Sequence, residues 1–294
     1  NLALIYQEQG EYCPAATSLR ESLDIARGIG DRAGTAIALI NTANLLLEMG
    51  DRQAPATHYR SAIEIAEETG EKWILAFSLS FLGEYHMATD EMGLARGYLQ
   101  SALDESRRIG MQALEIQVSA NLSLIESRIG SEAAALEKGH DTLERAMNLG
   151  DSDAILKTRW RLAEICLTCG IPDEACRIAV GGLKVARHRR HLIYEWRFLS
   201  LIGQSIDANA CPGHAIRPLR RAAAILLDIH RGLDENLREQ YRNQPEIRTG
   251  MERLRMLAER MKDGSTVTFC NEMMDDPDAD DATIALETGD PEGS

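Results

Sequence analysis

Glycine recurs every twenty residues along most of this chain. It occupies positions 10, 30, 50, 70, 110, 130, 150 and 170, and the series is interrupted at Asp90 and at Arg190. An amphipathic stretch of helix length separates successive glycines, as in residues 50–71. Because glycine readily takes the left-handed conformation that ends an α-helix, the spacing predicts a helix end at each step. A fixed internal period indicates a repeat architecture rather than one enlarged core.

Residues that can begin a new helix follow most of these glycines. Side chains able to accept a hydrogen bond from the free amides of a first turn stand at Asp31, Asp51, Ser131 and Asp151. Glu11 and Glu71 place negative charge at the positive end of the helix dipole. Each such position therefore predicts the end of one helix and the start of the next.

The composition favours helices throughout. Hydrophobic residues make up 44% of the chain but aromatic residues only 5%, which suits closely packed helices better than a sheet. The predicted helices cover residues 1–9, 12–29, 31–49, 52–69, 71–89, 91–109, 111–129, 131–149, 151–169, 172–189, 191–209 and 213–231.

Small residues recur every forty residues, which is twice the glycine period. This longer period predicts that the helices pack in pairs, two to a repeat. The first helix of each pair has a small residue at Ala3, Ala43, Gly83, Ser123, Ala163 and Gly203. The second helix carries small, large and small residues at i, i+4 and i+7, as in Ala95, Leu99 and Ala102. Small side chains let two helices approach closely, and the larger one fills the gap.

Leu82, Gly83, Ala95, Leu99 and Ala102 resemble the tetratricopeptide repeat pattern. The resemblance extends over residues 1–231 as six repeats, the first of them truncated. The forty-residue period is similar to that of kinesin light chains and of bacterial multidomain signalling proteins. The resemblance implies an all-α solenoid, a right-handed superhelix of antiparallel helix pairs.

Beyond residue 231 the forty-residue register is lost. Residues 232–262 predict two shorter helices that cap the apolar end of the solenoid. Residues 263–294 contain ten acidic residues and no Lys or Arg, so we expect an acidic disordered tail.

Charge, hydropathy and motifs argue against several function classes. The formal net charge is −14, and without the ten acids of the tail 36 acidic residues face 32 basic ones, so no basic field would attract nucleic acid. No apolar run has membrane-spanning length. Gly-rich phosphate loops and the His-Glu-x-x-His and Gly-x-Ser-x-Gly motifs are absent. We expect a cytoplasmic protein with no enzymatic activity, no cofactor and no direct nucleic-acid or membrane binding.

Two clusters leave alternatives open. Cysteines that could supply a zinc site stand at 166, 169, 176 and 211, but only one C-x-x-C is present, and a buried free cysteine also packs as a small apolar residue. A basic cluster comprises Lys184, Arg187, His188, Arg189, Arg190, His191 and Arg197. It could meet an acidic partner, nucleic acid or the acidic tail, or it could simply complement a helix dipole.

Polar residues share one face of the first helices of the repeats. In the family that the chain resembles, this face lines a concave groove. Asparagine side chains there can pair with both the donors and the acceptors of an extended peptide backbone. The candidate groove residues are Asn41, Asn44, Glu48, Glu84, Asn121, Arg128, Arg161 and Glu164. An ordinary solvated helix face is the alternative.

Together these features predict a non-catalytic module for protein interaction or regulation. Because the chain begins midway through a repeat, we expect a fragment of a larger bacterial signalling protein of kinase or ATPase type. It would bind an extended segment of a protein or peptide partner in its groove. The alternative is the peptide- or effector-sensing domain of a transcriptional regulator.

Overall fold

The computed structural model describes residues 2–209 and 211–275, and within them every regular element is an α-helix. The helices are α1 (Leu2–Glu8), α2 (Tyr12–Gly28), α3 (Arg32–Glu48), α4 (Ala54–Thr69), α5 (Lys72–Ala88), α6 (Met92–Arg108), α7 (Gln112–Arg128), α8 (Glu132–Leu149), α9 (Ser152–Thr168), α10 (Pro172–Arg189), α11 (Leu192–Ala208), α12 (Pro212–Arg231), α13 (Glu235–Arg242), α14 (Pro245–Arg260) and α15 (Gly264–Asp275). The predicted all-α fold class is confirmed, and the bounds of α1 to α12 differ from the predicted ones by at most two residues.

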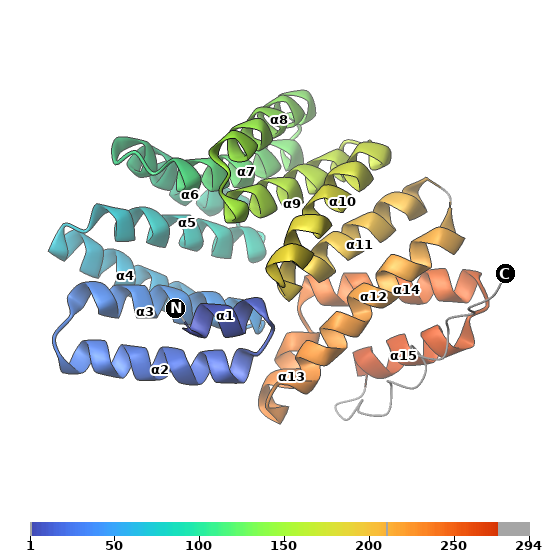
Figure 1. The fold of residues 1–294 in the computed structure, drawn as a ribbon, viewed down its shortest axis with the longest axis horizontal. Helices are drawn as coiled ribbons and strands as arrows, with labels where there is room; N and C mark the ends of the chain where they lie inside the picture. Colours follow the sequence, from blue (N-terminus) through green and yellow to red (C-terminus); the bar gives the residue numbers. More distant parts are fainter. Residues whose placement is uncertain (1, 210, 276–294) are drawn as a thin grey trace.

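The helices pack as consecutive antiparallel pairs that follow a curve (Figure 1). From α1 to α13 each helix contacts its neighbours in sequence, and consecutive odd-numbered helices from α3 to α11 also contact one another. The odd-numbered helices therefore form the inner layer of the curve, and their even-numbered partners form the outer layer.

The turns between helices share one backbone conformation. All eight glycines of the period have a φ between 71° and 98°. Asp90 and Arg190, which interrupt the glycine series, keep the same left-handed conformation with φ of 63° and 56°. The packing of the flanking helices thus imposes this turn even where an L-residue adopts it at some cost.

Side-chain capping follows the prediction at three of four positions. Asp31 and Asp151 each accept a hydrogen bond of 2.8 Å from the amide three residues later. Asp51 accepts from the amides of Gln53 and Ala54, and α4 begins at Ala54, two residues later than predicted. Ser131 makes no capping hydrogen bond, so that prediction is wrong, because a residue able to cap needs a backbone geometry that Ser131 does not adopt.

Large side chains of the second helix pack against the small residues of the first helix in each pair. A Cβ added at Gly83 would lie 2.7 Å from Cγ of Leu99, and one added at Gly203 would lie 2.4 Å from Cγ of Leu219. Because real Cβ atoms do not approach so closely, these glycines permit the close packing of the two helices in each pair.

The solenoid closes on itself, since its last helices contact its first repeat (Figure 1). The rings of Tyr12 and Tyr241 meet edge to face with centroids 6.1 Å apart. Nε2 of Gln244 donates to the backbone oxygen of Glu48 at 2.8 Å. Residues 232–262, expected to cap only the last repeat, pack on α12 and also join the last repeat to the first.

The prediction of a disordered tail from residue 263 is wrong for residues 264–275, which form α15. Phe269 and Cys270 are fully buried in the main core, and Nε of Arg220 donates to Oγ1 of Thr266 at 2.8 Å. The few apolar residues of this stretch are enough to hold α15 in place, because they pack against the main core. Residues 276–294, the rest of the predicted tail, lie outside the described residues.

Candidate binding groove

The inner layer of helices encloses a groove with a volume of about 790 Å³. Its walls are the inner faces of α1, α3, α5, α7, α9 and α11, and the corner between α13 and α14 contributes to its lining. The groove therefore depends on both the curvature of the repeats and the closure of the solenoid.

Six of the eight predicted residues line this groove. They are Asn44, Glu48, Glu84, Arg128, Arg161 and Glu164. Asn41 does not line it. Asn121 is fully buried beneath the surface, where its Oδ1 accepts from Nε of Arg161 at 2.8 Å. The oxygen of Asn44 is also engaged, because it accepts from the Tyr59 hydroxyl at 2.6 Å.

The predicted clamp of paired asparagines is therefore not assembled. Asn121 instead supports a charged side chain from below, and Asn44 offers only its amide nitrogen to the groove. The sequence pattern placed these residues on the correct helices, but side-chain packing assigned them to internal hydrogen bonds.

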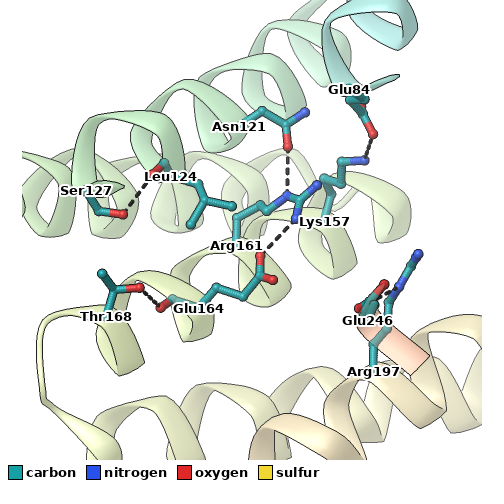
Figure 2. Close-up of polar contacts among 10 residues, drawn as sticks. All are labelled: Glu84, Asn121, Leu124, Ser127, Lys157, Arg161, Glu164, Thr168, Arg197 and Glu246. Carbon is teal, nitrogen blue, oxygen red and sulfur yellow. Dashed lines mark hydrogen bonds and ion pairs between the residues drawn. The ribbon is translucent and has the colours of Figure 1, made fainter. Parts of the chain in front are cut away.

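Charged residues of the groove form separate close pairs (Figure 2). Lys157 pairs with Glu84, and Nη1 of Arg161 lies 2.8 Å from Oε2 of Glu164. Burial acts to raise the pKa of Glu84, but Lys157 and Arg161 outweigh it and hold the pKa below its usual range. Glu84 is thus an ionised carboxylate paired with a cation from another repeat.

Trp160 provides a flat surface for two cations. The guanidinium carbon of Arg161 lies 3.7 Å from the Trp160 ring centroid, and that of Arg197 lies 4.2 Å from it. Such cation–π contacts fix the orientation of both guanidinium groups. Nε of Arg197 lies 3.6 Å from Oε1 of Glu246, which reaches the groove from the first turn of α14 (Figure 2).

Aromatic residues of α4 and α5 lie beside these charged pairs. Phe81 stacks on Tyr59 at 6.3 Å and on Phe77 at 6.2 Å, and Trp73 meets Phe77 edge to face at 6.4 Å. Tyr59 and Phe81 line the groove itself. The groove therefore presents aromatic rings as well as charged groups.

Sequence reasoning missed Lys157, Trp160 and Glu246, and it assigned Arg197 to the basic cluster rather than to the groove. A signal existed for two of them, because residues 37, 77, 117, 157 and 197 recur one helical turn before the predicted stripe and face the same way. Glu246 had no such signal, since its place in the groove depends on closure of the solenoid.

The predicted basic cluster is not a single surface patch. Arg187 pairs with Glu195 at 2.9 Å, and Arg189 lies 3.2 Å from Asp153. Arg197 belongs to the groove. His191 also lines the groove, and burial lowers its pKa to about 4, with the neighbouring arginines acting in the same direction.

The six cysteines are free thiols. Burial raises the pKa of Cys166 to about 12, which suits a thiol packed as a small apolar residue. Among the residues that the structure describes, no group of three or more His, Cys, Asp or Glu side chains is placed to hold a metal ion. Nor does any described helix combine the length and hydropathy needed to cross a bilayer.

Comparison with known proteins relates the sequence to one repeat family. Residues 1–68 match the family model described as tetratricopeptide repeat. No curated protein sequence matches the chain significantly.

Several solved structures share the fold. A Rap protein complexed with Competence and Sporulation Factor is 13% identical with a TM-score of 0.64, and the match covers 92% of this chain and 71% of that one. The Rap conjugation gene regulator of plasmid pLS20, in complex with the Phr* peptide, is 15% identical with a TM-score of 0.63 and coverages of 91% and 74%.

A third structure is a Signal Transduction ATPase with Numerous Domains from Pyrococcus horikoshii, which has a tetratricopeptide repeat sensor. It is 14% identical with a TM-score of 0.52, and the match covers 87% of this chain and 40% of that one. Residues 1–68 thus match the tetratricopeptide repeat family by sequence, and the described chain shares its helical solenoid fold with these solved structures.

Proposed function

We propose that this chain is a non-catalytic interaction module that binds an extended peptide segment in its groove. One observation carries the proposal: inner helices of all six repeats contribute side chains to a single groove of about 790 Å³. Its lining combines charged groups with aromatic rings, which suits a peptide that carries both kinds of side chain. The solved Rap regulator that holds the Phr* peptide supports a peptide as the ligand.

The proposed site consists of the six lining residues from the predicted stripe together with Lys157, Trp160 and Arg197. Asn121 acts from below by holding Arg161. Unlike a backbone clamp of asparagines, this site offers charged donors and acceptors together with aromatic rings. Such groups recognise side chains as well as backbone.

We further propose that binding serves signalling in the cytoplasm, within a larger protein of ATPase or kinase type. The likeness to an ATPase with a tetratricopeptide repeat sensor supports this context. The likeness to a conjugation gene regulator favours the alternative, a sensor domain in gene regulation. Kinase or P-loop motifs elsewhere in the full-length protein would favour the first context, and a helix-turn-helix the second.

Peptide selection tests the proposal directly. A phage library of random peptides is selected on the purified chain, and enriched peptides are then tested on two variants. Ser200→Trp fills the groove, which Ser200 lines, whereas Ser101→Trp adds the same bulk on the exposed face of α6. We expect the peptides to lose binding to the first variant and to retain binding to the second.

Two outcomes count against the proposal. Enriched peptides that bind Ser200→Trp as tightly as the unmodified chain would place the binding site outside the groove. Selection that enriches no peptide would refute peptide binding. Circular dichroism of both variants controls for unfolding.

A further inference from the structure

Arg197 is poorly satisfied compared with the other cations beside Trp160. Lys157 has Glu84 as a close partner, and Arg161 has both Asn121 and Glu164. The ion pair of Arg197 with Glu246 spans 3.6 Å, and the buried Nε of Arg197 makes no hydrogen bond within the described residues. A guanidinium group ordinarily binds a carboxylate through two short hydrogen bonds, so this site is incompletely filled.

Stacking on Trp160 holds the guanidinium group of Arg197 in place before a ligand binds. The ring, 7% exposed, holds the guanidinium plane at a centroid distance of 4.2 Å. The side chain of Arg197 is 17% exposed, so solvent and ligands reach it through the groove. A ligand group that approaches its edge gains hydrogen bonds without first ordering a flexible side chain.

Glu246 enters the groove from outside the repeats. It lies in the first turn of α14, next to the corner residue Gln244, and its side chain is 44% exposed. Gln244 anchors the corner to the backbone of Glu48. Desolvation raises the pKa of Glu246, and the nearby Arg197 only partly offsets this.

The charges of the groove indicate which ligand group fits. Acidic side chains that line it are Glu8, Glu48, Glu84, Asp153, Glu164 and Glu246, and basic ones are Arg52, Arg128, Lys157, Arg161 and Arg197. If a ligand carboxylate replaces the Glu246 carboxylate, the numbers of acidic and basic groups in the groove stay the same. A phosphate group would add a second negative charge beside these acids, and repulsion would disfavour it.

We propose that Glu246 occupies, within the same chain, the place of a ligand carboxylate, and that an acidic peptide binds by displacing Glu246 from Arg197. This inference rests on the proposed peptide-binding function. The corner between α13 and α14 is then an internal competitor. Because the corner also joins the last repeat to the first, an acidic ligand loosens the closure of the solenoid as it binds.

Peptide affinities test this competition. An enriched peptide is labelled, and its binding is measured by fluorescence anisotropy in its acidic form and with each Asp or Glu changed to the amide. Versions with a free and an amidated C-terminus separate a side-chain carboxylate from the terminal one. We expect removal of one carboxylate to weaken binding about tenfold to a hundredfold, the effect of losing a charge-assisted hydrogen-bonded pair.

Variants of the chain complete the test. Arg197→Gln should abolish the preference for the acidic peptide, whereas Glu246→Gln should tighten its binding by about threefold to tenfold, because the competitor is weakened. Matched controls are Arg217→Gln on α12 and Glu252→Gln on α14, both of exposed residues outside the groove, and they should change nothing. Should Arg197→Gln fail to fold, Glu246→Gln and the peptide substitutions still decide the question.

The possible results separate the two proposals. Peptides that require an open groove but bind equally well in acidic and amide forms would overturn this inference and leave the proposed function standing. Weaker binding to Glu246→Gln would also overturn it, since Glu246 would then assist the ligand. Failure to select any peptide would refute both proposals.

Discussion

Replacing Tyr241 by alanine should open the closed solenoid. Tyr241 lies at the end of α13, is 2% exposed, and meets Tyr12 of the first repeat edge to face at 6.1 Å. Its ring is thus a principal contact between the two ends of the repeat array. Loss of the Tyr241 ring should weaken this contact between the two ends and leave the packing within each helix pair unchanged.

The magnitude follows from burial. Truncation of a buried aromatic side chain to alanine costs about 3–5 kcal/mol, of which roughly 0.5–1.5 kcal/mol belongs to the aromatic pair. Since each 1.4 kcal/mol changes an equilibrium constant about tenfold, the open form should gain roughly 150-fold to 5,000-fold relative to the closed form.

Native-state hydrogen exchange measures this shift. Amides of α13 and α2 that exchange through opening should lose protection by the same factor. Met256→Ala on α14, where the side chain is 54% exposed, is the control and should change stability by no more than about 0.5 kcal/mol. Faster exchange in α13 with unchanged exchange in α2 would refute the reasoning, because the closing contact would then not couple the two ends.

Three further predictions concern packing and charge. Ala102→Arg should cost about 3 kcal/mol or more, because Ala102 is fully buried between helices, and an unchanged melting temperature would contradict the assigned repeat register. Phe269→Ala should lower the melting temperature by removing about 3–5 kcal/mol, whereas the exposed Thr268→Ala should not; equal melts would contradict the packing of α15. Burial raises the pKa of Glu48, so its ionisation disfavours the folded state and this penalty fades as pH falls from neutral. Glu48→Gln should therefore melt at least as high as the unmodified chain at neutral pH, with the difference shrinking on acidification; a lower melt at neutral pH would show that the charge is stabilising.

Local chemistry explains how much of the fold could be predicted from the sequence. A helix ends where the backbone turns left-handed, and glycine marks those positions within a few residues of each boundary. The close contact between Gly83 and Leu99 was predictable, because both residues belong to one forty-residue unit. The groove stripe was likewise predictable, since residues at i, i+3 and i+7 share a helix face whatever surrounds it.

The tertiary structure decided what the groove residues do. Asn121 became a buried support because Arg161, forty residues later, lies over it. Glu246 reached Arg197 only because the solenoid closes, and α15 formed because a core was available to cover Phe269. Periodicity in a sequence predicts which residues share a helix face and which residues contact each other in neighbouring repeats. Contacts between distant parts of the chain depend instead on the accumulated curvature of all the repeats, which no single repeat encodes.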